Sequence, residues 1–124
     1  MDIRGINSLV LAYLGDAVYE EKIRLYLLSK GINKVNLLQQ VAINYVSAKR
    51  QAYFLSVLLE RKFFNEEEIS LIKRARNAKS HNAPKGCDII TYKKATGLEA
   101  VIGYFKLTGQ EEKINKLIEI IVEV

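Results

Sequence analysis

Apolar residues recur at helical spacing along nearly the whole chain, and this periodicity restricts the fold to one built of helices. The only proline, Pro84, lies in a polar segment with small residues at 80–91, which we expect to form one long loop. The strict alternation of apolar and polar residues that indicates a strand is weak throughout. We therefore predict an all-α fold of about seven helices.

Capping residues and glycines set the expected helix ends. A first helix over about residues 8–14 is expected to run through Gly15, or to kink there, into a second helix that ends before Gly31. Asn65 is a strong N-cap residue, and the three glutamates that follow it are favourable near the positive, N-terminal end of a helix. Both features predict that a helix begins here. The remaining helices are expected at 36–45, 47–62, 92–107 and 111–124.

Length and composition fit one globular domain over residues 1–124. With 49% hydrophobic and 27% charged residues, a chain of this size buries roughly two thirds of its unfolded surface and needs no disulfide to fold. Its one cysteine, Cys87, cannot form an internal disulfide, and no cleavable apolar leader or membrane-length apolar run is present. We expect a cytoplasmic protein with no membrane segment.

Two carboxylates stand in apolar, helix-patterned segments far apart in the sequence, Asp16 within residues 11–20 and Glu99 within residues 96–103. A charge set among core residues is costly unless a cation meets it. The pair therefore indicates a Mg²⁺ site that is completed by water and by substrate phosphate oxygens. Glu20, one helical turn after Asp16, is a candidate further ligand.

Each of these carboxylates also has a purely structural explanation. Asp16 is suited to cap the second expected helix, and Glu20 to form an ion pair with Lys22 or Arg24. Glu99 has three lysines as possible partners, which are Lys93, Lys94 and Lys106.

The positive charge of the chain is concentrated in residues 73–94, which hold seven basic residues and one acid, Asp88. The net charge of the whole chain is +5, so the rest of the sequence is close to neutral. A basic segment together with a carboxylate pair suits a polyanionic substrate that needs phosphate neutralisation and a metal ion. A solvated helix face and loop would carry the same charge without binding anything.

Taken together, these segments resemble the ribonuclease III family. The family signature, a Leu-Gly-Asp-Ala helix followed late in the domain by a Glu-Ala-Leu-Ile-Gly helix, is matched here at residues 13–18 (Tyr-Leu-Gly-Asp-Ala-Val) and 98–103 (Leu-Glu-Ala-Val-Ile-Gly). Residues 46–52 and 74–92 extend the similarity to the compact subgroup, the Mini-ribonucleases III, which has only the catalytic domain. Larger members carry further acids where this chain has Leu9, Ala12 and Thr96.

The resemblance implies a fold, an assembly and a reaction. It implies an all-α endonuclease domain that forms a homodimer through an apolar face, with one strand of double-stranded RNA cut by each subunit. Asp16 and Glu99 would be the catalytic residues and would hold Mg²⁺, with Mn²⁺ as a substitute, to give 5′-phosphate products. The implied natural substrate is the precursor of large-subunit (23S) ribosomal RNA.

Because no further domain follows Val124 in this sequence, RNA binding is expected from the catalytic domain itself, through contacts to phosphates and 2′-hydroxyls. His81 and Cys87 lack partner motifs for catalysis, so we expect a phosphate contact or solvation for the first and a structural or exposed thiol for the second. The alternative function is a catalytically silent module of the same fold that only binds structured RNA. The expected RNA contacts are Lys49, Arg50, Lys73, Arg74, Arg76, Lys79, Lys85 and Lys93.

Overall fold

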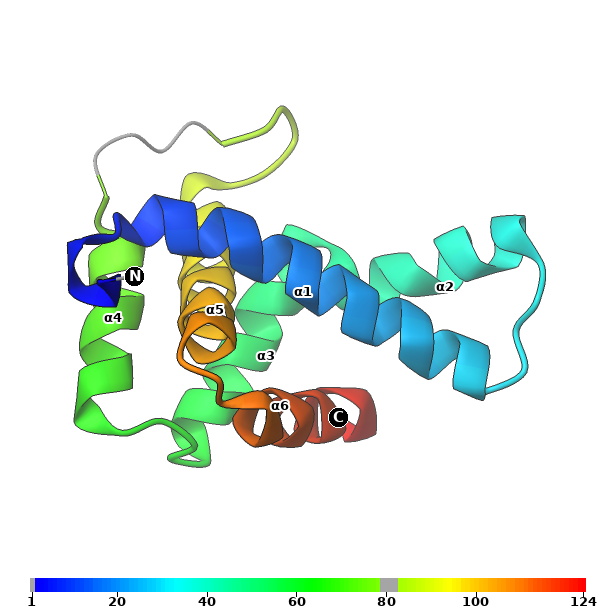
Figure 1. The fold of residues 1–124 in the computed structure, drawn as a ribbon. Coiled ribbons are helices and arrows are strands. Elements are labelled where there is room, and N and C mark those ends of the chain that lie inside the picture. Colours follow the sequence, from blue (N-terminus) through cyan, green and yellow to red (C-terminus); the bar gives the residue numbers. More distant parts are fainter. Residues whose placement is uncertain (1, 79–82) are drawn as a thin grey trace.

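The computed structural model describes residues 2–78 and 83–124, and over these residues it contains helices and no strand (Figure 1). The all-α prediction is confirmed. There are six α-helices where about seven were expected, because residues 8–29 form one continuous helix. The elements are the 3-10 helix η1 (Ile3–Gly5), α1 (Ser8–Ser29), α2 (Val35–Val46), α3 (Ala48–Glu60), α4 (Glu66–Arg76), α5 (Ile89–Leu107) and α6 (Glu111–Glu123).

The helix α5 is the centre of the fold, with α1, α3 and α4 packed around it and α6 following its C-terminal end (Figure 1). Nearly all of its residues from Ala95 to Phe105 are buried, so its apolar residues are not confined to one stripe. A helix that is apolar on all sides is a core helix rather than a surface helix. Because Glu99 is part of this central helix, it lies next to the helices that surround α5.

Local capping explains two helix starts. Asn65 forms a capping box in which its side chain accepts from Glu68 N (2.8 Å) and its own N–H donates to the Glu68 carboxylate (3.0 Å). The start predicted at residue 92 is wrong, because Asp88 caps α5 by accepting from Thr91 N and the helix begins at Ile89.

Gly15 and Gly103 lie where α1 and α5 cross with their backbones in contact. A Cβ atom on Gly15 would lie 1.7 Å from the carbonyl oxygen of Glu99, and one on Gly103 would lie 2.0 Å from the carbonyl oxygen of Leu11. Neither distance leaves room for a side chain, so the close approach of the two helices requires glycine at both positions. The helix α1 continues through Gly15 without a break. The crossing therefore brings the residue after Gly15 next to Glu99.

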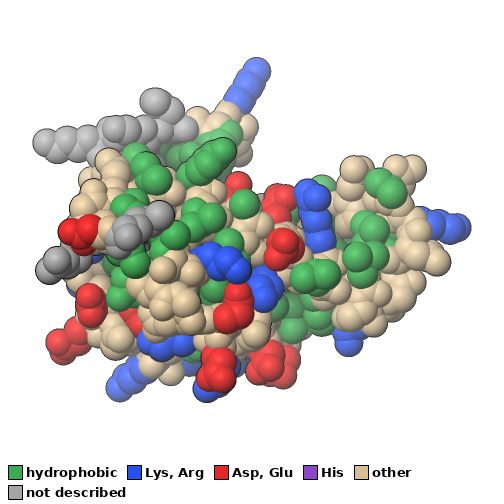
Figure 2. All heavy atoms as spheres, in the orientation of Figure 1, with side chains coloured by type: hydrophobic (Ala, Val, Ile, Leu, Met, Phe, Trp, Pro, Cys, Tyr) green, Lys and Arg blue, Asp and Glu red, His purple; other side chains and the backbone are tan. Residues whose placement is uncertain are grey.

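The C-terminal half of α1 and all of α2 extend to one side of the core (Figure 1). No residue of α2 is fully buried, and its outer side exposes Val35, Leu37 and Ile43. Figure 2 shows apolar side chains gathered at this end of the molecule, between acidic and basic ones. Among the described helices, none has the length and apolar character needed to cross a membrane.

Candidate metal centre at the crossing of α1 and α5

Asp16 of α1 and Glu99 of α5 share one open pocket of about 300 Å³. Asp16 is exposed at this pocket and Glu99 is half-buried. On α5, Tyr92, Thr96 and Glu99 are spaced by four and then three residues, so their side chains lie on the same face of the helix. The pocket is lined by Leu9, Ala12, Tyr13 and Asp16 from α1 and by Tyr92, Thr96 and Glu99 from α5.

The two carboxyl groups interact directly. The pKa of Glu99 is raised from its ordinary value of 4.5 to about 9, first by burial and then by the hydrogen bond and the charge of Asp16. The amide of Gln51 lowers this pKa and the more distant charge of Glu20 raises it further. Burial and the neighbouring charge of Asp16 disfavour the ionised form of Glu99, so this carboxyl group holds a proton unless a cation is bound beside it.

Gln51 of α3 is a buried polar residue that the sequence-based reasoning missed, and its amide lowers the pKa of Glu99. Its side chain is 2% exposed, and its Nε2 donates to the carbonyl oxygen of Val46 at 3.0 Å. Its Oε1 is buried with no hydrogen-bond partner among the described residues. The sequence does contain a signal for this residue, because a glutamine stands among apolar core positions of α3. A buried polar side chain normally has a hydrogen-bond partner inside the fold.

The donor set fits Mg²⁺, which binds proteins through one or two carboxylates and completes its shell with water and phosphate oxygens. The carboxylates of Asp16 and Glu99 supply hard oxygen atoms at one pocket. Within the described part of the chain, no three His, Cys, Asp or Glu side chains come together as a metal site. Glu20 instead pairs with Arg24 at 2.9 Å, the structural alternative given above.

The structural alternatives for the other two carboxylates do not hold. Asp16 lies inside α1, so it caps no helix. Lys106, one of the possible partners of Glu99, forms an ion pair with Glu111 at 3.1 Å. The interactions that shift the pKa of Glu99 come from acids and from the amide of Gln51.

A pH dependence of stability follows from the raised pKa of Glu99. The folded protein holds a proton on Glu99 that the unfolded chain releases above its ordinary pKa of 4.5. In metal-free protein the free energy of unfolding therefore falls as the pH rises from about 4.5 to about 9. Urea unfolding in the presence of a chelator measures this fall, and Glu99→Gln is expected to remove it. An equal fall in Glu99→Gln would contradict the assignment.

The predicted RNA contacts are spread over several helices. Lys49, Lys73, Arg74 and Lys85 are exposed, as phosphate contacts must be. Arg50 is tied within the fold, because its Nε donates to Asn44 O at 3.0 Å and its guanidinium lies 4.9 Å from the centre of the Phe54 ring. The others that are described, Arg76 and Lys93, are half-buried, while Lys79 and His81 fall outside the described residues.

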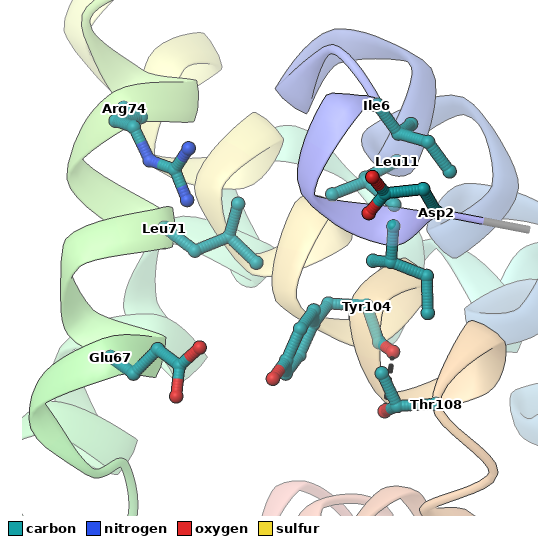
Figure 3. Close-up of a pocket in the computed structure, with 9 residues that line it drawn as sticks. Asp2, Ile6, Leu11, Glu67, Leu71, Arg74, Tyr104 and Thr108 are labelled. Carbon is teal, nitrogen blue, oxygen red and sulfur yellow. Dashed lines mark hydrogen bonds between the residues drawn. The ribbon is translucent and has the colours of Figure 1, made fainter.

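Arg74 lies at a second pocket, of about 370 Å³, which has no residue in common with the carboxylate pocket (Figure 3). Its side chain points toward a space between α4, α5 and the N-terminal segment, with Leu71 beside it on the wall formed by α4. The acids Asp2 and Glu67 line the same pocket. Arg74 is exposed, and these acids lower the positive potential around it.

Comparison with known proteins identifies the family of this chain. The ribonuclease III domain family matches residues 9–110, which include both carboxylates and both crossing glycines. The chain belongs to the ribonuclease III family. A relative from Enterococcus faecalis named Mini-ribonuclease 3 is 48% identical over 94% of this chain and 89% of its own length. Another of that name, from Staphylococcus aureus, is 43% identical over 98% of this chain and 91% of its own length.

A solved structure also matches this ribonuclease III family member over its whole length. The crystal structure of a protein from Fusobacterium nucleatum superposes with a TM-score of 0.89 at 37% sequence identity. The match covers 100% of this chain and 99% of the other. Within the ribonuclease III fold of this chain, the glycines of the two signature segments are the residues that let α1 and α5 touch.

Proposed function

We propose that this endoribonuclease of the ribonuclease III family cleaves double-stranded RNA with a divalent metal ion, Mg²⁺ or in its place Mn²⁺, held by Asp16 and Glu99. The observation that carries the proposal is that these two carboxylates line one open pocket, where Asp16 helps burial to raise the pKa of Glu99. None of the seven described residues that line this pocket is basic, so the protein itself offers the pair no cation there. A metal ion is the natural counter-charge for such a pair.

The residues of the pocket have distinct tasks in this reaction. Bound metal would supply Lewis-acid activation of water and neutralise charge on the phosphodiester, giving a 5′-phosphate and a 3′-hydroxyl. Asp16, exposed at the pocket, is the carboxylate that an incoming phosphate meets first, while Glu99 is half-buried behind it. Tyr13 and Tyr92 line the same pocket and limit how a strand enters.

RNA binding is assigned to the exposed basic side chains Lys49, Lys73, Arg74 and Lys85, together with Lys93 on α5. Such side chains contact phosphates and carry no base specificity by themselves. Lys79 belongs to the same basic segment in the sequence. The resemblance to the ribonuclease III family supports the precursor of large-subunit ribosomal RNA as the natural substrate.

A homodimer is the proposed assembly. Side chains along the outer side of α1 remain apolar and exposed, with Tyr13 at 84% and Leu25 at 56%. Large apolar side chains concentrated on one helix of a small protein are typical of an interface. A two-fold pair of subunits also matches an RNA duplex, whose two strands run in opposite directions, so each carboxylate pair would serve one strand.

Digestion of a long RNA duplex tests the proposal. We expect double-strand breaks with Mg²⁺, no cleavage with a chelator, and a solution mass near twice 14.1 kDa. Mixed dimers of wild-type and Asp16→Asn subunits should make mainly single-strand nicks, because one centre of each dimer is inactive. A salt-dependent gel shift without cleavage would instead indicate the silent RNA-binding module. Paired cuts made by a monomer would contradict the dimer.

A further inference from the structure

The last turn of α4 carries three cations, Lys73, Arg74 and Arg76. None of the three forms an ion pair with a described residue. The acids nearest to them in the sequence are engaged elsewhere, because Glu68 belongs to the capping box of α4 and Asp88 caps α5. Cations are favourable at the negative, C-terminal end of a helix, which explains their presence but not how each one is held.

Arg76 differs from the other two cations in being half-buried. Its stem lies against Gly97 in the middle of α5, since a Cβ atom on Gly97 would be 3.1 Å from Cγ of Arg76. The side chain of Ile72 shares this space, also at 3.1 Å. Glycine inside a helix is less favourable than alanine, so its presence here is explained by the close approach of these two side chains from α4.

The guanidinium of Arg76 is not used within the fold. It makes no hydrogen bond, ion pair or ring contact with any described residue, and none of its nitrogens is among the buried atoms without a partner. Its N–H groups therefore meet solvent at the end of a stem that packing restrains. A planar guanidinium held in this way matches two oxygens of one phosphate and loses less entropy on binding than a free lysine.

The position of Arg76 agrees with a phosphate partner. In Figure 1 the C-terminal end of α4 and the N-terminal end of α5 lie at the same end of the molecule. Lys73 on α4 and Lys93 on α5, two of the proposed RNA contacts, belong to these helix ends.

We infer that Gly97 and Arg76 act together in RNA binding, with Arg76 as a fixed contact to a backbone phosphate and Gly97 as the residue that positions it. The missing side chain of Gly97 lets the stem of Arg76 rest on the central helix, which orients the guanidinium before RNA arrives. This inference rests on the proposed function, the binding and cleavage of double-stranded RNA.

Duplex binding in a chelator, measured by gel shift over a range of salt concentrations, tests the inference. Arg76→Met keeps an apolar stem over Gly97 and removes the charge, so affinity is expected to fall about tenfold and the salt dependence to lose about one unit of slope per subunit. Arg76→Lys should recover little of this loss, because an ammonium does not form the two parallel hydrogen bonds of a guanidinium. In cleavage, Arg76→Met should raise the half-maximal duplex concentration and leave the saturated rate unchanged.

A double-mutant cycle isolates the role of Gly97. The methyl group of Gly97→Ala would press on the stem of Arg76, so duplex affinity should fall about threefold, and this fall should disappear in the Arg76→Met background. The variant is expected to fold, since alanine favours a helix and its nearest contacts are two side-chain carbons. An equal fall in both backgrounds would show that Gly97 does not act through Arg76 and would overturn its positioning role.

Two further variants serve as controls. Arg61→Met makes the same exchange at an exposed position after α3 and should bind as the wild type does. Lys73→Met removes an exposed cation of the same helix and should cost less affinity than Arg76→Met. If the wild type binds and cleaves the duplex while Arg76→Met binds no more weakly than Lys73→Met, the inference is overturned and the proposed function stands. If the wild type does not bind the duplex, both are wrong.

Discussion

Asp16→Asn and Glu99→Gln are each expected to lower the rate of duplex RNA cleavage by a factor on the order of a thousand, while the helical fold and duplex binding are retained. Each change removes one ligand charge at nearly constant volume, and a metal ion contributes several kcal/mol to stabilising the charge that develops in the reaction. Single-turnover cleavage with saturating Mg²⁺ gives the rates, and gel shifts in a chelator give the affinities.

The design separates loss of chemistry from loss of folding. Because the pKa of Glu99 is raised to about 9 in the metal-free protein, Glu99→Gln should be at least as stable as the wild type at neutral and higher pH. An inactive variant that is no less stable cannot be explained by misfolding. Glu119→Gln, an exposed acid on α6, makes the same chemical change away from the site and should cleave normally. Wild-type turnover by either site variant would refute the assignment of the metal ligands.

Gly15→Ala is expected to destabilise the fold by about 3 kcal/mol or more and to abolish cleavage with it. The new methyl group would lie 1.7 Å from the carbonyl oxygen of Glu99, which is backbone and cannot move aside like the end of a flexible side chain. The helices α1 and α5 would have to separate, and Asp16 would move away from Glu99. Gly103→Ala, with its methyl group 2.0 Å from Leu11 O, should behave alike.

Urea unfolding measures the loss of stability, and Gly5→Ala supplies the matched control. A Cβ atom on Gly5 would meet nothing within 4 Å, and its backbone is not in the left-handed region. That variant should therefore unfold within about 0.5 kcal/mol of the wild type. If Gly15→Ala were as stable as Gly5→Ala, the close crossing would not be what holds the carboxylates together.

Local signals in the sequence were sufficient for most of the helices. The capping box at Asn65 appears where a cap was predicted, and Gly31 and Gly109, which both have a positive φ, lie just beyond two of the predicted helix ends. The start of α5 was placed three residues late, because Asp88 was counted as part of the loop rather than as a cap. These features depend on residues within one helical turn of each other, so they can be found without a tertiary structure.

The carboxylate pair shows where pattern alone was no longer enough. Apolar segments interrupted by Asp16 and Glu99 predicted a shared cation site, and the resemblance to a family indicated that the two belong together. Neither predicted the effect of Gln51 on the pKa of Glu99, because the two residues are distant in sequence. Glu20 was selected by its spacing from Asp16, yet in the structure it pairs with Arg24.

The sequence by itself determined the helical class, most helix ends, and the two acidic segments, because helical periodicity and capping are local properties of the chain. Only the tertiary structure decided what Gly15 does. In a sequence a glycine inside a helix indicates a break, since it lacks helix propensity. Its missing side chain matters here because the backbone of α5 occupies that space, and this contact is what places Asp16 beside Glu99.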